Sequence, residues 1–213
     1  NEATFLFSFG CPFLCTHCGN HAIARVYGKK NNSPRYSSVE SCIREIKKVV
    51  SQFPVYRINF MDNIFGLDKK WRREFCEKYR KRIRLPFVCR SRADVFDEDC
   101  ARMLRDAGCR CVKMGVESGN DFIRNKVLNR QMSRETVVKA FDIASKFNLR
   151  TYAFNIIGVP GETEEMIWDT IRFNRELKPT TSYAHVYYPY RGTALGDRCF
   201  KQELVDEKAW GEF

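Results

Sequence analysis

The chain has 213 residues, of which 44% are hydrophobic and 30% are charged, and its formal net charge at pH 7 is +11. This length suits one domain with a sizeable core and is short for two domains. No apolar run approaches bilayer length and no signal peptide opens the chain, so we expect a soluble, cytoplasmic protein without a membrane partner. Because the chain opens on Asn1 and a strand-like run follows almost at once, residues 1–213 are expected to be one domain taken from a longer protein.

Short apolar runs bounded by turn residues predict six strands. Several of these runs are apolar nearly throughout, which is expected when helices cover both faces of a sheet. The predicted strands are Thr4–Ser8, Val55–Phe60, Pro86–Arg90, Cys111–Val116, Thr151–Ile157 and Ser182–Tyr188.

Amphipathic segments separate these runs and predict five helices. Ser37 followed by Glu40 predicts a capping box for the first helix. The other four helices are expected to begin at single capping residues, namely Asp68, Asp97, Ser133 and Thr163. Alternating strands and helices predict an α/β fold of six units with parallel strands joined by right-handed crossovers, as an open sheet or a partly closed barrel.

Two stretches do not follow this alternation. Asn20–Ser37 is basic and contains Gly28, Asn31, Asn32 and Pro34, so it is predicted to be a long loop. The tail after Thr193 has no readable pattern.

Positive charge is concentrated on one predicted helix, between Lys69 and Arg84. A solvated outer helix face explains such a cluster. A footprint for nucleic acid or for an acidic partner domain also explains it. No RNA-binding signature accompanies the cluster, so charge alone does not decide between the two.

Ten cysteines is a high count for this length. Disulfides usually stabilise small secreted domains, so reduced thiols are expected here, some of them as metal ligands. Cys89, Cys109 and Cys111 gather near two strands, where a second cluster is conceivable although no fourth ligand is evident. Three cysteines fall on helical stripes and are expected to be small buried hydrophobes: Cys42, Cys76 and Cys100.

A separate cysteine motif directly follows the first predicted strand. Cys11, Cys15 and Cys18 place three thiols within eight residues on a loop that starts with glycine and proline. Such thiols can bind an iron–sulfur cluster, and three ligands for a four-iron cluster leave one iron open to a further ligand. A zinc site that adds His21 is the main alternative, although closed zinc sites usually consist of two separated ligand pairs. Three simply buried thiols suit such a polar turn poorly.

Polar residues also follow the other predicted strands, where β/α barrels carry their working residues. Asp62 and Asn63 follow the second strand and either shape a turn or bind a ligand. Glu117 directly follows an apolar strand, and a charge there needs a partner. Gly158 belongs to a turn that also permits close backbone approach by a ligand, and Tyr190 belongs either to the core or to a site.

The motif Cys-x3-Cys-x2-Cys, with the ring of His17 before the last cysteine, resembles the signature of radical S-adenosylmethionine (SAM) enzymes. The resemblance extends from Thr4 to about Thr193. It implies a six-unit partial (β/α) TIM-like barrel in which the three cysteines hold a 4Fe-4S cluster and SAM chelates the open iron. It further implies cleavage of SAM to methionine and a 5′-deoxyadenosyl radical, and a flavodoxin- or ferredoxin-like electron donor.

The same resemblance implies the SAM contacts. Most members carry a Gly-Gly-Glu-like motif for the SAM amino group where this chain has Asp62 and Asn63, so the chain departs from the pattern there. The other implied contacts are Glu117 and Ser118 for the amino or ribose groups, Arg130 or Arg92 for the carboxylate, Ile156 and Gly158 for adenine, and His17 and Tyr190 at the same site.

The strand-end motifs taken together look most like radical SAM proteins that carry a cobalamin-binding domain before the barrel. That subgroup includes methyltransferases and ring-forming enzymes, so a cobalamin-dependent methyltransferase is expected, with cobalamin held by a domain outside these residues. A radical SAM enzyme that modifies RNA and a non-catalytic zinc-binding module are the two alternatives. Substrate contacts are expected from Asn20–Ser37 and from domains outside this chain.

Overall fold

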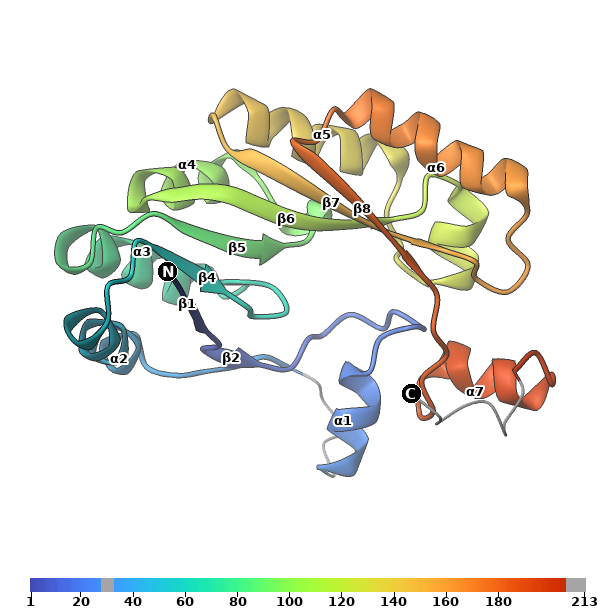
Figure 1. Ribbon diagram of the computed structural model, residues 1–213, viewed down its shortest axis with the longest axis horizontal. Helices are drawn as coiled ribbons and strands as arrows, with labels where there is room; N and C mark the ends of the chain where they lie inside the picture. Colours follow the sequence, from blue (N-terminus) through green and yellow to red (C-terminus); the bar gives the residue numbers. More distant parts are fainter. Residues whose placement is uncertain (28–32, 206–213) are drawn as a thin grey trace.

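The computed structural model describes residues 1–27 and 33–205, and its centre is one six-stranded sheet. The strand order is β1-β4-β5-β6-β7-β8, and all neighbours are parallel. Because each strand is added beside the preceding one, the sheet winds in one direction and curls into a half barrel (Figure 1). The predicted partial barrel is confirmed. Its strands are β1 Glu2–Phe5, β4 Arg57–Phe60, β5 Phe87–Ser91, β6 Cys109–Glu117, β7 Arg150–Ile157 and β8 Thr181–Val186.

Five helices connect these strands and cover the outer face of the sheet (Figure 1). They are α2 Val39–Gln52, α3 Lys69–Arg82, α4 Glu98–Ala107, α5 Arg134–Lys146 and α6 Glu164–Leu177. The side chains of the four predicted single caps, Asp68, Asp97, Ser133 and Thr163, each accept a hydrogen bond from the first turn. The predicted capping box of the first helix is wrong by one residue, because Ser38 accepts from the amide of Ser41. The carbonyl of Ser37 instead accepts from Trp71 Nε1 at 2.8 Å.

An aromatic core fixes the early strands against α3. Phe60 of β4 is fully buried and lies 5.5 Å, centroid to centroid, from Phe75 of α3 in an edge-on arrangement. Its ring also lies 5.3 Å from that of Phe87 of β5 and 4.6 Å from that of Phe65. Such aromatic pairs stabilise a core beyond the area that they bury. Phe60 of β4 and Phe87 of β5 are therefore committed to packing against α3, which leaves the inward face of these strands for a site.

The segment predicted as a long loop is partly structured, so that prediction is wrong. It contains helix α1 (Asn20–Val26) and strand β3 (Arg35–Tyr36), which pairs antiparallel with β2 (Ser8–Phe9). Glycine and asparagine residues predict a loop only where they stand, and the residues on either side of them form these two elements. Gly28, Asn31 and Asn32 lie outside the described residues.

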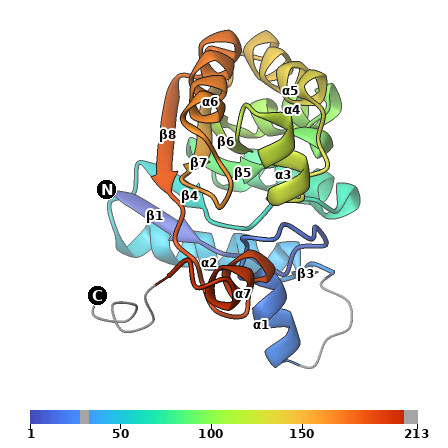
Figure 2. The same cartoon turned by 90° about the vertical axis from the view of Figure 1, so that its right-hand side faces the viewer.

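The tail after Thr193 forms helix α7, Ala194–Lys201, and Thr193 caps it through a 3.1 Å bond from Gly196 N. Helices α1 and α7 lie side by side beyond one end of the sheet (Figure 2). Arg25 of α1 donates to the carbonyl of Gly192, just before α7, at 2.5 Å. No helix in residues 1–27 or 33–205 is both long and apolar enough to cross a membrane.

Candidate active site

A cavity of about 570 Å³ lies on the concave side of the half barrel, at the carboxyl ends of its strands. The cysteine loop, the ends of β5 and β6, and the aromatic edge formed by β7 and β8 all contribute to it. Ten of the predicted site residues line it: Cys11, Cys15, His17, Cys18, Asn63, Arg92, Glu117, Arg130, Ile156 and Tyr190.

Thr16 anchors the cysteine loop on two sides. Its amide donates to the carbonyl of Leu128 at 3.1 Å, and its hydroxyl donates to the carbonyl of Val127 at 2.6 Å. Both acceptors lie at the C-terminal end of the π-helical turn η2, Ile123–Val127. Its own carbonyl accepts from the amide of Leu195 in α7 at 2.9 Å. A small buried cluster that includes Leu128 and Leu195 lies beside these contacts. The loop is therefore held by tertiary contacts as well as by its own turns.

The three motif thiols share the cavity with few competing partners. Cys18 N donates to the carbonyl of Cys15 at 3.2 Å, and Asn20 Nδ2 donates to Cys18 Sγ at 3.1 Å. Burial is the main factor that raises the pKa of Cys11, and the charges of Cys18 and Cys15 add to it. The three sulfurs are thus close enough to influence one another electrostatically.

The alternative zinc ligand, His21, is engaged elsewhere. Its Nε2 lies 2.5 Å from the carbonyl of Phe13, which requires that nitrogen to donate and removes it as a metal ligand. In the described parts of the chain, no three Cys, His, Asp or Glu side chains are placed to share a single metal ion. In an iron–sulfur cluster, by contrast, each cysteine binds its own iron, so the thiols need not meet at one point.

Two buried guanidinium groups approach Cys15. Arg92 Nη1 and Arg130 Nη1 donate to its sulfur at 3.4 and 3.5 Å. Arg92 is held in place by Asp94, with Nε 2.8 Å from Oδ1, and its guanidinium stacks 3.9 Å from the ring centroid of Phe13. Arg92 and Arg130 therefore place two positively charged hydrogen-bond donors on the sulfur of Cys15.

Glu117 is built into the end of β6 in an unusual conformation. Its φ is 65°, a left-handed value that costs a residue with a side chain about 1 kcal/mol or more. The strand pairing shifts register between Gly115 and Glu117, and Glu117 Oε1 then lies 3.6 Å from Arg130 Nη1. A methyl group on Gly115 would lie 2.1 Å from that same oxygen, so only glycine leaves room for the carboxylate. Although burial opposes its charge, the carboxylate of Glu117 keeps the pKa of Arg130 above its usual value.

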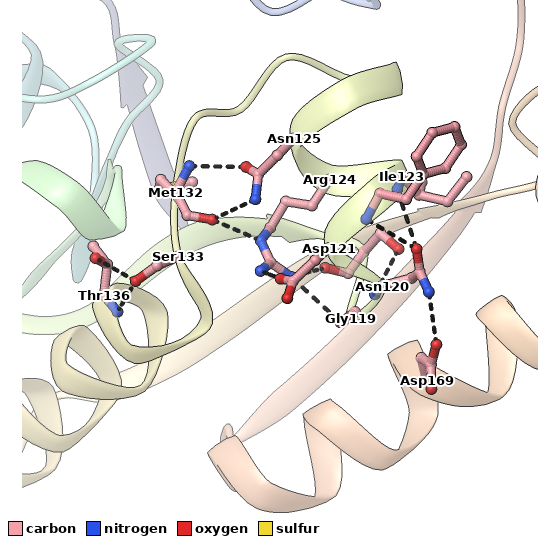
Figure 3. A network of polar contacts seen from close by, with 12 residues as sticks. Gly119, Asn120, Asp121, Ile123, Arg124, Asn125, Met132, Ser133, Thr136 and Asp169 are labelled. Atoms are coloured by element: carbon pink, nitrogen blue, oxygen red, sulfur yellow. Dashed lines mark hydrogen bonds and ion pairs between the residues drawn. The ribbon is translucent and has the colours of Figure 1, made fainter.

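Arg124 braces the segment between β6 and α5 that carries Arg130. Its side chain is fully buried, and it donates to the carbonyls of Ser118 at 2.9 Å and Met132 at 3.0 Å (Figure 3). It also pairs with Asp121. The amide of Arg130 donates to the carbonyl of Arg124 at 2.9 Å, so this brace fixes where Arg130 enters the cavity.

His17 and Asn63 line the cavity with different partners. Burial lowers the pKa of His17, and its Nδ1 is buried without a hydrogen-bond partner among the described residues. Asn63 Nδ2 donates to Asn20 Oδ1 at 3.1 Å, which links the end of β4 to the cysteine loop. His17 thus retains hydrogen-bonding capacity toward a ligand.

Three predicted site residues do not line the cavity. Asp62 is fully buried behind it, where Oδ1 accepts from Ser8 Oγ at 2.5 Å, and burial raises its pKa. Ser118 is fully buried against Thr170, with the two hydroxyl oxygens 3.2 Å apart. Gly158 is exposed in a turn with φ of 75°, and its amide donates to Glu162 Oε2 at 2.6 Å. Each of them shapes the site from outside its surface.

Sequence reasoning missed several residues that line the cavity. Arg90 and Lys113 are charges inside apolar strand runs, and that contrast was the available signal. The others had no signal of their own, because their inclusion depends on which strands are neighbours. They include Phe13, Asn20, Phe154 and His185.

Comparison with known proteins places this geometry in a family. Residues 5–173 match the model of the Radical SAM superfamily. An uncharacterized methyltransferase of Pyrococcus horikoshii is 28% identical over 207 residues, which are 97% of this chain and 44% of that protein. A tRNA-2-methylthio-N(6)-dimethylallyladenosine synthase of Clostridium botulinum is 26% identical over 200 residues, 87% of this chain and 42% of that protein.

A solved structure gives the same result at the level of the fold. TsrM of Kitasatospora setae, a radical S-adenosylmethionine methyltransferase, has a TM-score of 0.79 at 20% identity, with 94% of this chain and 39% of TsrM covered. A second TsrM structure contains cobalamin and a [4Fe-4S] cluster. The chain spans less than half the length of these relatives. The family model covers most of the chain, including the cysteine loop, the Glu117–Arg130 pair and strands β4 to β7. The chain belongs to the radical SAM superfamily of enzymes.

Proposed function

We propose that this chain binds a 4Fe-4S cluster through Cys11, Cys15 and Cys18, and that it cleaves SAM reductively at the open iron. We further propose that the reaction is a methyl transfer of the cobalamin-dependent type. One observation carries the first proposal: the three thiols and the Glu117–Arg130 pair line the same cavity.

The residues around the thiols fit a cluster. Asn20, Arg92 and Arg130 donate to the sulfurs of Cys18 and Cys15, and hydrogen bonds of this kind stabilise the negative charge of thiolate ligands. When bound and reduced, the cluster together with SAM supplies a 5′-deoxyadenosyl radical. The protein's part is to hold the thiolates in place and to keep bulk water from the cavity.

The remaining lining residues fit SAM. Arg130 offers a cation to the SAM carboxylate, and its Nε is buried without a partner in the described part of the chain. Glu117 can accept hydrogen bonds from the amino group or the ribose hydroxyls. Ile156 provides an apolar wall for adenine, while Asn63 and Tyr190 lie at the same cavity. Asp62 and Ser118 support this arrangement from behind the cavity surface, while Gly158 lies in the exposed turn before α6.

The methyl-transfer proposal rests on the relatives. One is named a methyltransferase, and TsrM is a methyltransferase whose structure holds cobalamin. In this proposal, residues 1–213 are the radical SAM core of a longer protein, and cobalamin is bound by another domain of that protein. The proposal also requires a low-potential electron donor of the flavodoxin or ferredoxin kind, and therefore a reducing, cytoplasmic setting.

RNA modification is the second candidate, and the tRNA-modifying relative favours it. The basic helix α3 does not add support. Lys78 pairs with Glu40 and Glu74, and Arg82 pairs with Glu40, so acidic neighbours compensate part of the charge on this helix. This pattern is typical of a solvated outer helix.

The test begins with anaerobic reconstitution of the cluster, followed by electron paramagnetic resonance of the reduced protein with and without SAM. A 4Fe-4S signal that shifts on addition of SAM, together with formation of 5′-deoxyadenosine, is expected. Bound zinc with no cluster signal would refute the proposal. Methyl transfer is tested separately, by whether methylcobalamin supports turnover, while salt-sensitive tRNA binding would favour the second candidate.

A further inference from the structure

Two cations lie on the floor of the cavity, below the residues assigned to the cluster and SAM. Arg90 of β5 and Lys113 of β6 are register partners on neighbouring strands, and both line the cavity. Arg90 lies two residues before Arg92 and Lys113 four before Glu117. Since a strand rises about 3.3 Å per residue, the backbones of Arg90 and Lys113 lie roughly 7 Å or more from those of Arg92 and Glu117, toward the N-terminal ends of the strands.

Neither cation has a carboxylate partner among the described residues. Arg90 Nη1 lies 3.4 Å from the carbonyl of Met61, and Lys113 Nζ lies 3.4 Å from Asn59 Oδ1, both long contacts. Burial lowers the pKa of Arg90 even though the charge of Asp62 opposes that effect.

The nearby acidic groups are otherwise engaged. Asp62 Oδ1 accepts from Ser8 Oγ and Glu117 pairs with Arg130, and neither carboxylate forms an ion pair with Arg90 or Lys113. Two partly buried cations that lack an ion-pair partner are costly when water is displaced from around them. An anionic ligand would remove that cost.

Aromatic rings line the neighbouring part of the cavity. Phe154 of β7 and His185 of β8 line the cavity with ring centroids 6.2 Å apart. The ring of Tyr152, the register partner of Lys113, lies 5.9 Å from Lys113 Nζ. The cavity floor is thus cationic along β5 and β6 and aromatic along β7 and β8.

We infer that Arg90 and Lys113 bind the acidic group of the substrate, a carboxylate or a phosphate, and that a planar unsaturated body lies against Phe154 and His185. This inference rests on the proposed function, since it names the substrate class of the same site. Two charged donors on adjacent strands can each donate to a different oxygen of one acid group. The flat body gains contact with the rings at little conformational cost.

Binding of matched probes tests the inference without turnover. Fluorine NMR would compare 4-fluorobenzoate with its neutral analogue 4-fluorobenzamide, on the protein as purified and after cluster and SAM loading. The acid is expected to bind about tenfold or more tightly than the amide, because charge-assisted hydrogen bonds add to the same ring contacts. Competition by inorganic phosphate and by acetate would show which acid group the pair prefers.

The double variant that combines Arg90→Gln with Lys113→Gln should lose this preference for the acid over the amide. The control pair Arg44→Gln with Lys47→Gln removes the same charge from the exposed face of α2 and should keep it. Equal affinity for acid and amide in the wild type, or unchanged benzoate binding in the Arg90/Lys113 pair, would overturn the inference. If that pair unfolds, the single change Lys113→Gln is judged by the same comparison.

Iron content and SAM binding of the same samples separate this inference from the proposed function. Absence of an acid preference in the wild type, with cluster and SAM binding intact, would refute the substrate class alone. Failure to bind cluster or SAM would instead refute the proposed function, whatever the probes show.

Discussion

The cysteine loop and the outer helical layer use the same residue in opposite surroundings. In the outer layer, burial raises the pKa of Cys76 and of Cys100 to about 12, so both remain protonated. In the loop, Cys15 is also largely buried, but two guanidinium groups approach its sulfur. Cys76 and Cys100 lie near the charge of Arg72, which opposes the effect of burial without outweighing it, whereas the sulfur of Cys15 accepts hydrogen bonds directly from two guanidinium groups.

The difference explains why a cysteine count misleads. Cys89 and Cys109 have sulfurs 3.9 Å apart and both are fully buried, and the hydrogen bond with Cys109 together with burial raises the pKa of Cys89 well above its usual value. Cys109 also contacts the carbonyl of Cys111 at 3.3 Å. This group is part of the packed sheet, and its surroundings favour thiols over ligating thiolates.

The largest effect is expected from Cys15→Ala. Loss of one of three thiolates should abolish cluster assembly, while the fold persists because the loop is also held through Thr16. Iron analysis and circular dichroism of the reconstituted protein measure the two properties. Cys76→Ala is the control from the outer layer and should retain full iron content. Normal iron in Cys15→Ala would break the distinction between the two regions.

The next effect is expected from Arg124→Met. The change leaves the buried carbonyl of Ser118 without its donor and removes one of the two donors to the carbonyl of Met132, which should reduce the free energy of unfolding by about 2–4 kcal/mol. Urea unfolding measures this loss. Arg134→Met is the control, since Arg134 is a partly exposed arginine paired with Glu176 and should change stability by about 1 kcal/mol or less. Equal losses in both variants would show that Arg124 is no special brace.

A smaller and more local effect is expected from Gly115→Ala. The added methyl group would displace the carboxylate of Glu117 from Arg130 and should weaken SAM binding about tenfold or more, with iron content unchanged. Equilibrium binding of SAM to the reconstituted protein measures it. Gly19→Ala adds the same methyl group where no atom lies within 4 Å, and SAM affinity should be retained. Identical SAM affinity in Gly115→Ala would remove the Glu117–Arg130 pair from the site.

The last expected effect appears only at alkaline pH. Cys76 and Cys100 have pKa values of about 12 in the folded protein against about 9 when unfolded, so folding favours their protonated forms. Their contribution to stability is complete below pH 9 and is lost as the pH rises from 9 toward 12, at up to about 1.4 kcal/mol per pH unit for each thiol. Urea unfolding at pH 8 and pH 10.5 measures the loss. Between pH 8 and pH 10.5, the free energy of unfolding of Cys76→Ala should fall by less than that of the wild type. An equal fall in both proteins would contradict the raised pKa of Cys76.

Local sequence was sufficient for most helices and for the cysteine motif. Asp68, Asp97, Ser133 and Thr163 cap helices because a short polar side chain bonds to an amide within the next turn, a contact of three residues or fewer. The Ser37 error had the opposite origin. The carbonyl of Ser37 is used by Trp71, which belongs to another helix, and Ser38 became the cap.

The cavity lining depended on distant contacts. Asp62 and Asn63 are neighbours in sequence, yet Asp62 turns to Ser8 behind the site while Asn63 enters it. Strand parity alone could not assign Glu117, because the register shift after Gly115 and a φ of 65° redirect its side chain. Pairing of β5 with β6 also made a cation pair out of Arg90 and Lys113.

The sequence by itself determined the alternation of strands and helices, four of the helix caps and the spacing of three thiols, because these follow from contacts within a few residues. Only the tertiary structure decided which side chains share the cavity, which arginines approach Cys15 and how Arg90 and Lys113 come together on the cavity floor. Those properties depend on strand order, register and burial, and each of these joins residues that lie far apart along the chain.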